Sequence, residues 1–207
     1  MCSIIASHSK DKLKELAELN AYRGQHSHSV YVIQDYEIKY KHRGLGPLKL
    51  DDHFLPDGYI IAHQQAPTTS NKKESTIHPA QIGKHLLWHN GIIKESYVKV
   101  MQKGLESSCT WDTKLLLQEL INYETPYKVD GTFSCIWYDG AEMMVFRNEI
   151  SPLFYDKYMN ISSTKFKDSM SLEPNMIHFL TYDEELNLTL QSGPTFETVE
   201  NPYYFGE

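Results

Sequence analysis

Hydrophobic residues recur along this chain in two spacings, one typical of helices and one typical of strands. A spacing of three to four residues predicts helices over residues 9–20, 94–105 and 112–123. Ser9 has the side chain expected at the N-cap of the first helix, and Asp112 has the one expected at the N-cap of the third. The rest of the chain is dominated by shorter apolar runs.

These shorter runs predict strands bounded by polar turns. They cover residues 4–5, 29–34, 37–41, 59–63, 84–88, 132–138, 143–147, 153–155 and 187–190. Asp35-Tyr36 and Asp139-Gly140 are short polar connections of the kind that join hairpin strands. Strands that follow one another through hairpins, with the helices grouped between them, favour antiparallel sheets. We therefore expect an α+β fold, and a single domain over residues 1–207.

Composition narrows the possible partners and the compartment. The 20 Lys and Arg against 27 Asp and Glu give a net charge of −7, which argues against nucleic acid as the main partner. Cys2, Cys109 and Cys135 cannot all pair and match no zinc spacing, so we expect a reducing, cytoplasmic compartment. The sequence lacks a signal-peptide pattern and any long apolar run, so we expect no membrane segment. His26 and His28 form a His-x-His pair, but no third ligand is suggested; we expect no metal and no cofactor.

Chemistry is suggested first at the amino terminus. A small residue after the initiator methionine favours removal of Met1, which would leave Cys2 with both a thiol and an α-amine. Their reference pKa values are about 8.5 and about 7.7–8.0, so the amine can accept the proton of the thiol near neutral pH. An N-terminal residue activated by its own amine is an established kind of nucleophile. The simpler interpretation is that Cys2 is a small apolar residue at the start of a strand.

An acyl-transfer site also needs hydrogen-bond donors for a developing oxyanion. His89-Asn90-Gly91, expected at the end of the strand over residues 84–88, supplies a side-chain amide and an unobstructed backbone N–H. Asn-Gly is equally a common turn. Arg23 would orient a carboxylate or brace the terminus, or be a surface arginine. Asp112 would bind a substrate ammonium, or be only the helix N-cap.

Taken together and in order, these segments resemble the class II glutamine amidotransferases, whose glutaminase domains have N-terminal nucleophiles. The resemblance covers residues 2–170. Its first half consists of Cys2-Ser3-Ile4-Ile5, Tyr22-Arg23-Gly24, Ala62-His63 with Pro67-Thr68, His89-Asn90-Gly91-Ile92-Ile93 and Asp112-Thr113. Its second half consists of Asp130-Gly131-Thr132-Phe133-Ser134, Arg147-Asn148, Pro152-Leu153-Phe154-Tyr155 and Ser162-Ser163 with Lys165.

The resemblance implies a four-layer α-β-β-α sandwich of two antiparallel sheets. It also implies that Cys2 is the nucleophile and that Asn90 and Gly91 form the oxyanion hole. Asp112 would bind the α-amine of glutamine, and Thr68 would lie near its carboxylate. Arg23 would brace the loop beside Cys2.

Gln65 departs from this family, which has an arginine here that pairs with the α-carboxylate of glutamine. A neutral amide does not reproduce a bidentate arginine–carboxylate contact, although Lys72 or Lys73 would be able to compensate. Ser3 in place of the usual glycine is a milder change.

The resemblance implies hydrolysis of the glutamine side-chain amide through a Cys2 thioester. Too few residues follow the last strands for a second catalytic domain, so we expect the ammonia to go to a synthetase on a separate chain. Two alternatives stay open. One is an N-terminal-cysteine amidohydrolase that acts on another amide, and the other is a degenerate amidotransferase that serves as a binding subunit.

Overall fold

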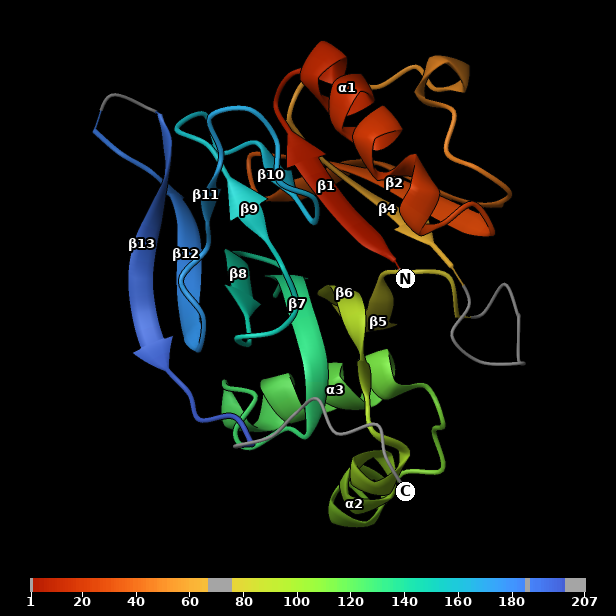
Figure 1. The fold of residues 1–207 in the computed structure, drawn as a ribbon, viewed down its shortest axis with the longest axis vertical. Coiled ribbons are helices and arrows are strands. Elements are labelled where there is room, and N and C mark those ends of the chain that lie inside the picture. The colour runs from red at the N-terminus through yellow and green to blue at the C-terminus, as the bar shows by residue number, and fades with distance from the viewer. Residues whose placement is uncertain (1, 67–75, 185–186, 200–207) are drawn as a thin grey trace.

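The computed structural model describes residues 2–66, 76–184 and 187–199, and two antiparallel sheets dominate this part of the chain (Figure 1). The first sheet has the strand order β11-β9-β10-β1-β4-β2-β3. Its central strand is β1, which pairs with β4 on one side and with β10 on the other. The strands are β1 (Ser3–Ser7), β2 (Ser27–Gln34), β3 (Glu37–Leu45), β4 (Tyr59–Gln65), β9 (Phe154–Tyr155), β10 (Ile161–Ser162) and β11 (Met170–Ser171).

The second sheet has the order β13-β12-β8-β7-β6-β5. Its longest ladder joins β6 and β7, from Leu86 opposite Tyr138 to Ile93 opposite Gly131. The strands are β5 (Ala80–Ile82), β6 (His85–Ile93), β7 (Gly131–Tyr138), β8 (Met143–Arg147), β12 (Met176–Tyr182) and β13 (Leu188–Thr195).

In the part of the chain that the structure describes, the α-helices are α1 (Lys10–Asn20), α2 (Glu95–Gly104) and α3 (Asp112–Tyr123), and the short 3-10 turns are η1 (Ala21–Arg23) and η2 (Leu50–Asp52). Ser9 is the N-cap of α1 as predicted, and its hydroxyl accepts the backbone N–H of Lys12 at 3.2 Å. The expected cap role of Asp112 is wrong, because Trp111 is the N-cap of α3. Within the described ranges no helix is long and apolar enough to cross a membrane.

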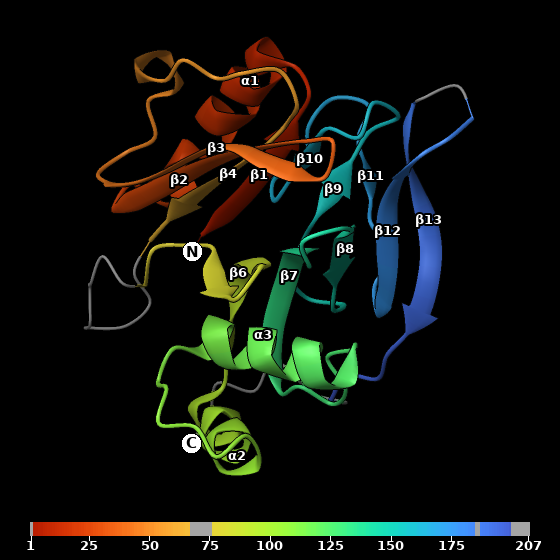
Figure 2. The same ribbon diagram turned by 180° about the vertical axis from the view of Figure 1, so that it is seen from behind.

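The two sheets lie face to face, with α1 outside the first sheet and α2 and α3 outside the second (Figures 1 and 2). Strand alternation produces these layers, since neighbouring side chains point to opposite faces of a sheet. On β1, Ile4 and Ala6 pack between the sheets, whereas Ile5 packs in the cluster that contains Leu13 and Leu16 of α1. The predicted four-layer α+β sandwich with antiparallel sheets is confirmed.

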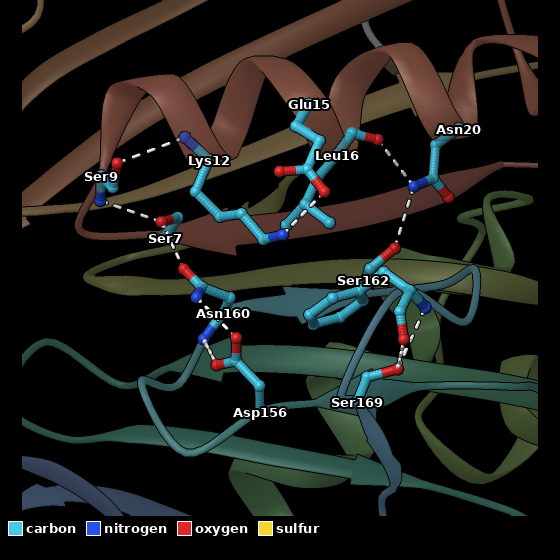
Figure 3. Close-up of polar contacts among 11 residues, drawn as sticks. Ser7, Ser9, Lys12, Glu15, Leu16, Asn20, Asp156, Asn160, Ser162 and Ser169 are labelled. Carbon is cyan, nitrogen blue, oxygen red and sulfur yellow. Dashed lines mark hydrogen bonds and ion pairs between the residues drawn. The ribbon is translucent and has the colours of Figure 1, made fainter.

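Polar contacts tie the first helix and strand to a much later part of the chain (Figure 3). The Asn20 side chain donates to the Leu16 carbonyl at 2.8 Å and to the Ser162 hydroxyl at 2.9 Å. The Ser7 hydroxyl donates to Asn160 at 2.6 Å. Because a hydrogen bond to a buried partner is costly to leave unmade, these contacts fix how β10 sits against β1.

The two predicted hairpins are present, and one predicted boundary is wrong. Asp35 and Tyr36 have φ values of 52° and 58°, as a type I′ turn requires, and they connect β2 to β3. Gly140 has φ 100° between β7 and β8. The segment His89-Asn90-Gly91 does not follow a strand. It lies inside β6, which continues to Ile93.

Candidate active site

Cys2 lies directly before β1 and is buried, with 7% of its surface exposed. Its Sγ donates to the Ala66 carbonyl at 3.5 Å, and its own carbonyl accepts the Nε–H of Arg23 at 3.0 Å. Burial raises the pKa of the Cys2 thiol, Asp112 raises it further, and Arg23 opposes them. The thiol is therefore protonated at neutral pH and needs a base to become a nucleophile.

The turn that carries Arg23 packs tightly against the end of β4. A Cβ at Gly24 would lie 2.5 Å from the backbone nitrogen of Ala66, so only glycine permits this approach. Arg23 is buried in that position. The tight packing brings Arg23 to the backbone of Cys2, where the sequence predicted a brace.

Asn90 faces Cys2's strand from the second sheet. Its Nδ2 donates to the Ser163 hydroxyl at 3.3 Å, and that same hydroxyl accepts the backbone N–H of Ile4 at 3.0 Å. Ser163 thus connects the start of β1 to the amide of Asn90. This link crosses from one sheet to the other, and sequence reasoning had given Ser163 no role beyond its place in the family pattern.

Gly91 is required by the backbone rather than by a turn. Its φ is 156°, and a Cβ there would lie 1.9 Å from the Thr132 carbonyl oxygen on β7. No side chain fits between these strands without moving backbone. The absent side chain lets β7 approach β6 closely beside Asn90.

Asp112 is the first residue of α3 and lies close to the other site residues. Its carboxylate accepts the backbone N–H of Thr113 at 2.7 Å and that of Ile93 at 3.3 Å. Its negative charge raises the pKa of both Cys2 and His89. A partly exposed carboxylate in this position can bind an ammonium group.

The Gln65 amide is already hydrogen-bonded. Its Oε1 accepts the Ser27 hydroxyl at 3.3 Å, and its Nε2 donates to the Thr76 carbonyl at 3.1 Å. The Oε1 also lies 3.3 Å from Nδ1 of His78. Thr68, Lys72 and Lys73 lie outside the described residues, and the structure says nothing of their predicted roles.

Three buried histidines, His63, His78 and His89, form what we call the inner cluster. The rings of His63 and His78 stack with centroids 4.1 Å apart. The Thr113 hydroxyl lies 3.1 Å from Nε2 of His78 and 3.1 Å from Nδ1 of His89, and it can donate its hydrogen to only one of them. Burial lowers the pKa of all three rings, that of His63 to about 3.

Sequence reasoning missed His78 altogether. It precedes Pro79 in a polar stretch without periodicity, and only the fold brings it against His63 from β4 and His89 from β6. No local pattern could have assigned it. Burial therefore favours the neutral form of the rings beside Asn90.

The structure therefore brings together a buried thiol, an amide donor on the facing strand and a carboxylate. A nucleophile, an oxyanion donor and an anchor for a substrate charge are the parts of an acyl-transfer site. Cys2, Arg23, Asn90, Gly91 and Asp112 lie in this region, and the roles that the resemblance implies for them stay predictions.

Comparison with solved structures gives the fold a family context. A scan of protein-family models finds no match, and a comparison with curated protein sequences finds none either. The glutamine phosphoribosylpyrophosphate amidotransferase of B. subtilis, solved with ADP and GMP, aligns over 93% of this chain at 14% identity with a TM-score of 0.63. This chain covers 49% of that enzyme, about half of its length.

A glutamine aminotransferase class-II domain protein from Silicibacter pomeroyi aligns over 92% of this chain and 98% of its own, at 11% identity and a TM-score of 0.50. Identities this low establish a shared fold. The chain has the sandwich fold of class II glutamine amidotransferases, as the sequence resemblance implied.

Proposed function

We propose that residues 1–207 form a single class II glutaminase domain that hydrolyses the side-chain amide of glutamine through a thioester on Cys2. The observation that carries this proposal is the Ser163 hydroxyl, which joins the start of β1 to the Asn90 amide in one hydrogen-bond network. The network holds the nucleophile and the oxyanion donor on two rigid sheets rather than on loops. Free thiols at Cys2, Cys109 and Cys135 agree with a reducing cytoplasm.

The proposed reaction requires removal of Met1, which leaves Cys2 with a free α-amine. That amine takes the thiol proton, because burial keeps the thiol protonated on its own. The sulfur then attacks the amide carbon of glutamine, and Asn90 Nδ2 with the Gly91 N–H stabilises the oxyanion. The ammonium formed on Cys2 returns its proton to the departing ammonia. Water finally cleaves the thioester, with the amine again acting as base.

Asp112 is proposed to bind the α-ammonium of glutamine. The α-carboxylate would lie near Arg23, Gln65 and Thr68, with no arginine at position 65 to pair with it in the usual way. We expect a high KM for glutamine, because a neutral amide gives a weaker contact than a guanidinium group.

The bonded state of Gln65 supports a second candidate substrate class. Its amide already bonds Ser27 and Thr76, so it has little capacity left for a carboxylate. A substrate amide that has no α-carboxylate would not need the arginine contact that is missing at position 65. A panel of primary amides compared with glutamine separates the two, and a higher kcat/KM for a non-amino-acid amide would favour this second class.

We further propose that the ammonia is used by a synthetase on a separate chain. On this proposal, turnover should be slow for the isolated chain and rise when the acceptor enzyme is added. Fast release of ammonia by the isolated chain would contradict the proposal of a partner enzyme.

The deciding experiment is intact-mass analysis before and after reaction with a glutamine-mimicking diazoketone. We expect a mature mass without Met1 and a single adduct that peptide mapping places on Cys2. A Cys135→Ser variant should label normally because Cys135 is buried in the core, whereas Cys2→Ser should not label. A retained Met1, or a folded protein that stays unlabelled and releases no ammonia, would leave the degenerate binding subunit as the better reading.

A further inference from the structure

A second group of three histidines lies away from the proposed active site. His28 is on β2, His42 is on β3, and His53 directly follows η2; we call them the outer cluster. Because His28 pairs with Gly44 across the two strands, His42 is its diagonal neighbour on the same face. One ligand nitrogen from each ring lies within 4.8 Å of the other two.

Two ring nitrogens of this cluster lie over Gly44, close to where a Cβ would be. An ideal Cβ at Gly44 would lie 3.1 Å from Nε2 of His28 and 3.0 Å from Nε2 of His42. Since glycine has no Cβ, that space stays empty of side-chain atoms. The ring of His53 completes the group, with its centroid 4.5 Å from that of His42.

The other ring nitrogens of His28 and His53 have hydrogen-bond partners, as is usual for metal-binding histidines. Nδ1 of His28 lies 3.0 Å from the Gly46 carbonyl, which can only accept, so Nδ1 carries the proton and Nε2 keeps its lone pair. Nδ1 of His53 lies 2.8 Å from the Tyr40 hydroxyl, which can accept in the same manner. Metal-binding histidines typically donate their other N–H to such a partner.

The three rings gain little from one another by hydrogen bonding, but each has a nitrogen whose lone pair can bind one shared cation.

We propose that His28, His42 and His53 bind a divalent transition-metal ion of the zinc type, with a fourth position for water. Tetrahedral zinc with Zn–N distances of about 2.0–2.1 Å places its ligand nitrogens about 3.4 Å apart. Small rotations of the half-exposed rings of His42 and His53 bring them to that spacing. The ion pins the edge strand β3 to the segment after η2.

This site is separate from the proposed glutaminase site. His28 lies on the face of the first sheet that carries Val30 and Val32, which pack in the cluster with α1. Cys2 stands two residues before Ile4 and so lies on the same side of the chain as Ile4, which packs between the two sheets. The sequence pointed to His26 as the partner of His28, whereas the fold supplies His42 and His53 instead.

The test is Zn²⁺ titration of the untagged, full-length protein against a chromophoric chelator, with Co²⁺ absorption as a second readout. We expect one equivalent to bind, and His42→Gln and His53→Gln each to weaken binding at least 100-fold. His26→Gln is the matched control and should bind as the parent does. Circular dichroism verifies folding of each variant, and if His42→Gln does not fold, His53→Gln decides.

The expected Co²⁺ spectrum has intense visible bands, because tetrahedral coordination gives them. Absence of binding would overturn the proposal. So would an ion that is lost in His26→Gln, or one held equally by the parent, His42→Gln and His53→Gln. None of these readouts depends on glutaminase activity, so the two proposals fail independently.

Discussion

The inner and outer clusters each consist of three histidines, but the two clusters differ in what their ring nitrogens face. In the inner cluster the ring nitrogens of His78 and His89 face protein partners, and His63 is fully buried with one nitrogen bonded to the His89 carbonyl at 3.1 Å. In the outer cluster only one nitrogen of His28 and of His53 faces a protein partner, and the others converge. A group of three histidines is therefore structural or ligand-binding according to whether both nitrogens of each ring face protein partners or one nitrogen of each ring faces the other rings.

The largest predicted effect is on catalysis, through Asn90, which lies beside the inner cluster. Asn90→Ala should lower kcat for amide hydrolysis about 100- to 1,000-fold with little change in folding, because one oxyanion donor is lost. Lys99→Ala on the exposed surface of α2 is the control and should keep parental activity. Equal kcat values for parent and Asn90→Ala, measured as ammonia release, would remove Asn90 from the oxyanion hole.

Two glycines allow a direct contrast of the clusters. Gly91→Ala should cost at least about 3 kcal/mol of unfolding free energy, because its Cβ meets backbone at positive φ. Gly44→Ala meets only the ends of two histidine rings, so its cost should stay within about 1 kcal/mol. It should instead weaken Zn²⁺ binding at least tenfold.

Denaturant titration and the chelator assay measure both variants. A Gly44→Ala protein as unstable as Gly91→Ala, or one with unchanged zinc affinity, would contradict the contrast.

The inner cluster should also make stability depend on pH. His63 has a folded pKa of about 3 against 6.5 for the unfolded chain, so its contribution is complete above pH 6.5 and is lost as pH falls toward 3. His63→Gln keeps a donor for the His89 carbonyl but cannot titrate. Between pH 4 and 6 its unfolding free energy should fall less steeply than the parent's, by up to about 1.4 kcal/mol per pH unit. Parallel curves in urea titrations would show that His63 is not held neutral.

The smallest predicted effect concerns the orientation of the outer cluster. Tyr40→Phe removes the hydroxyl beside Nδ1 of His53 and should weaken Zn²⁺ affinity about tenfold, since such outer partners orient a metal ligand. Tyr36→Phe, exposed at the tip of the same hairpin, is the control. Identical affinities for all three proteins would mean that His53 needs no such support.

Local patterns predicted the parts of this molecule that are stabilised locally. The Ser9 cap, α1 and the hairpin at Asp35-Tyr36 follow from neighbouring residues alone, and all are present. Strand β9 falls within the predicted strand over residues 153–155, whereas β10 and β11 have two residues each, too few for any period, and depend on their pairing with β1 and β9. Strand β12 is absent from the sequence-based prediction, although its aromatic and branched residues are typical of a strand.

The candidate site, too, was predictable from the sequence only in part. Cys2, Asn90 and Asp112 could be selected from their own chemistry, but the structure of their surroundings could not. Asn-Gly reads locally as a turn, yet pairing with β7 holds Gly91 extended inside β6. His42 and His53 come together through strand register and a connection around η2, which no spacing along the sequence reveals.

The position of β1 has a consequence for how the protein is made. The backbone N–H of Ile4 donates to the Ser163 hydroxyl across 159 residues of sequence, and β10 completes the pairing of β1 from a similar distance along the chain. The ribosome must therefore have synthesised the chain as far as Ser162 before the first strand has both neighbours. We expect nascent chains truncated before residue 160 to be protease-sensitive at their amino end, so that the Cys2 thiol reaches its buried position only after β10 has been synthesised.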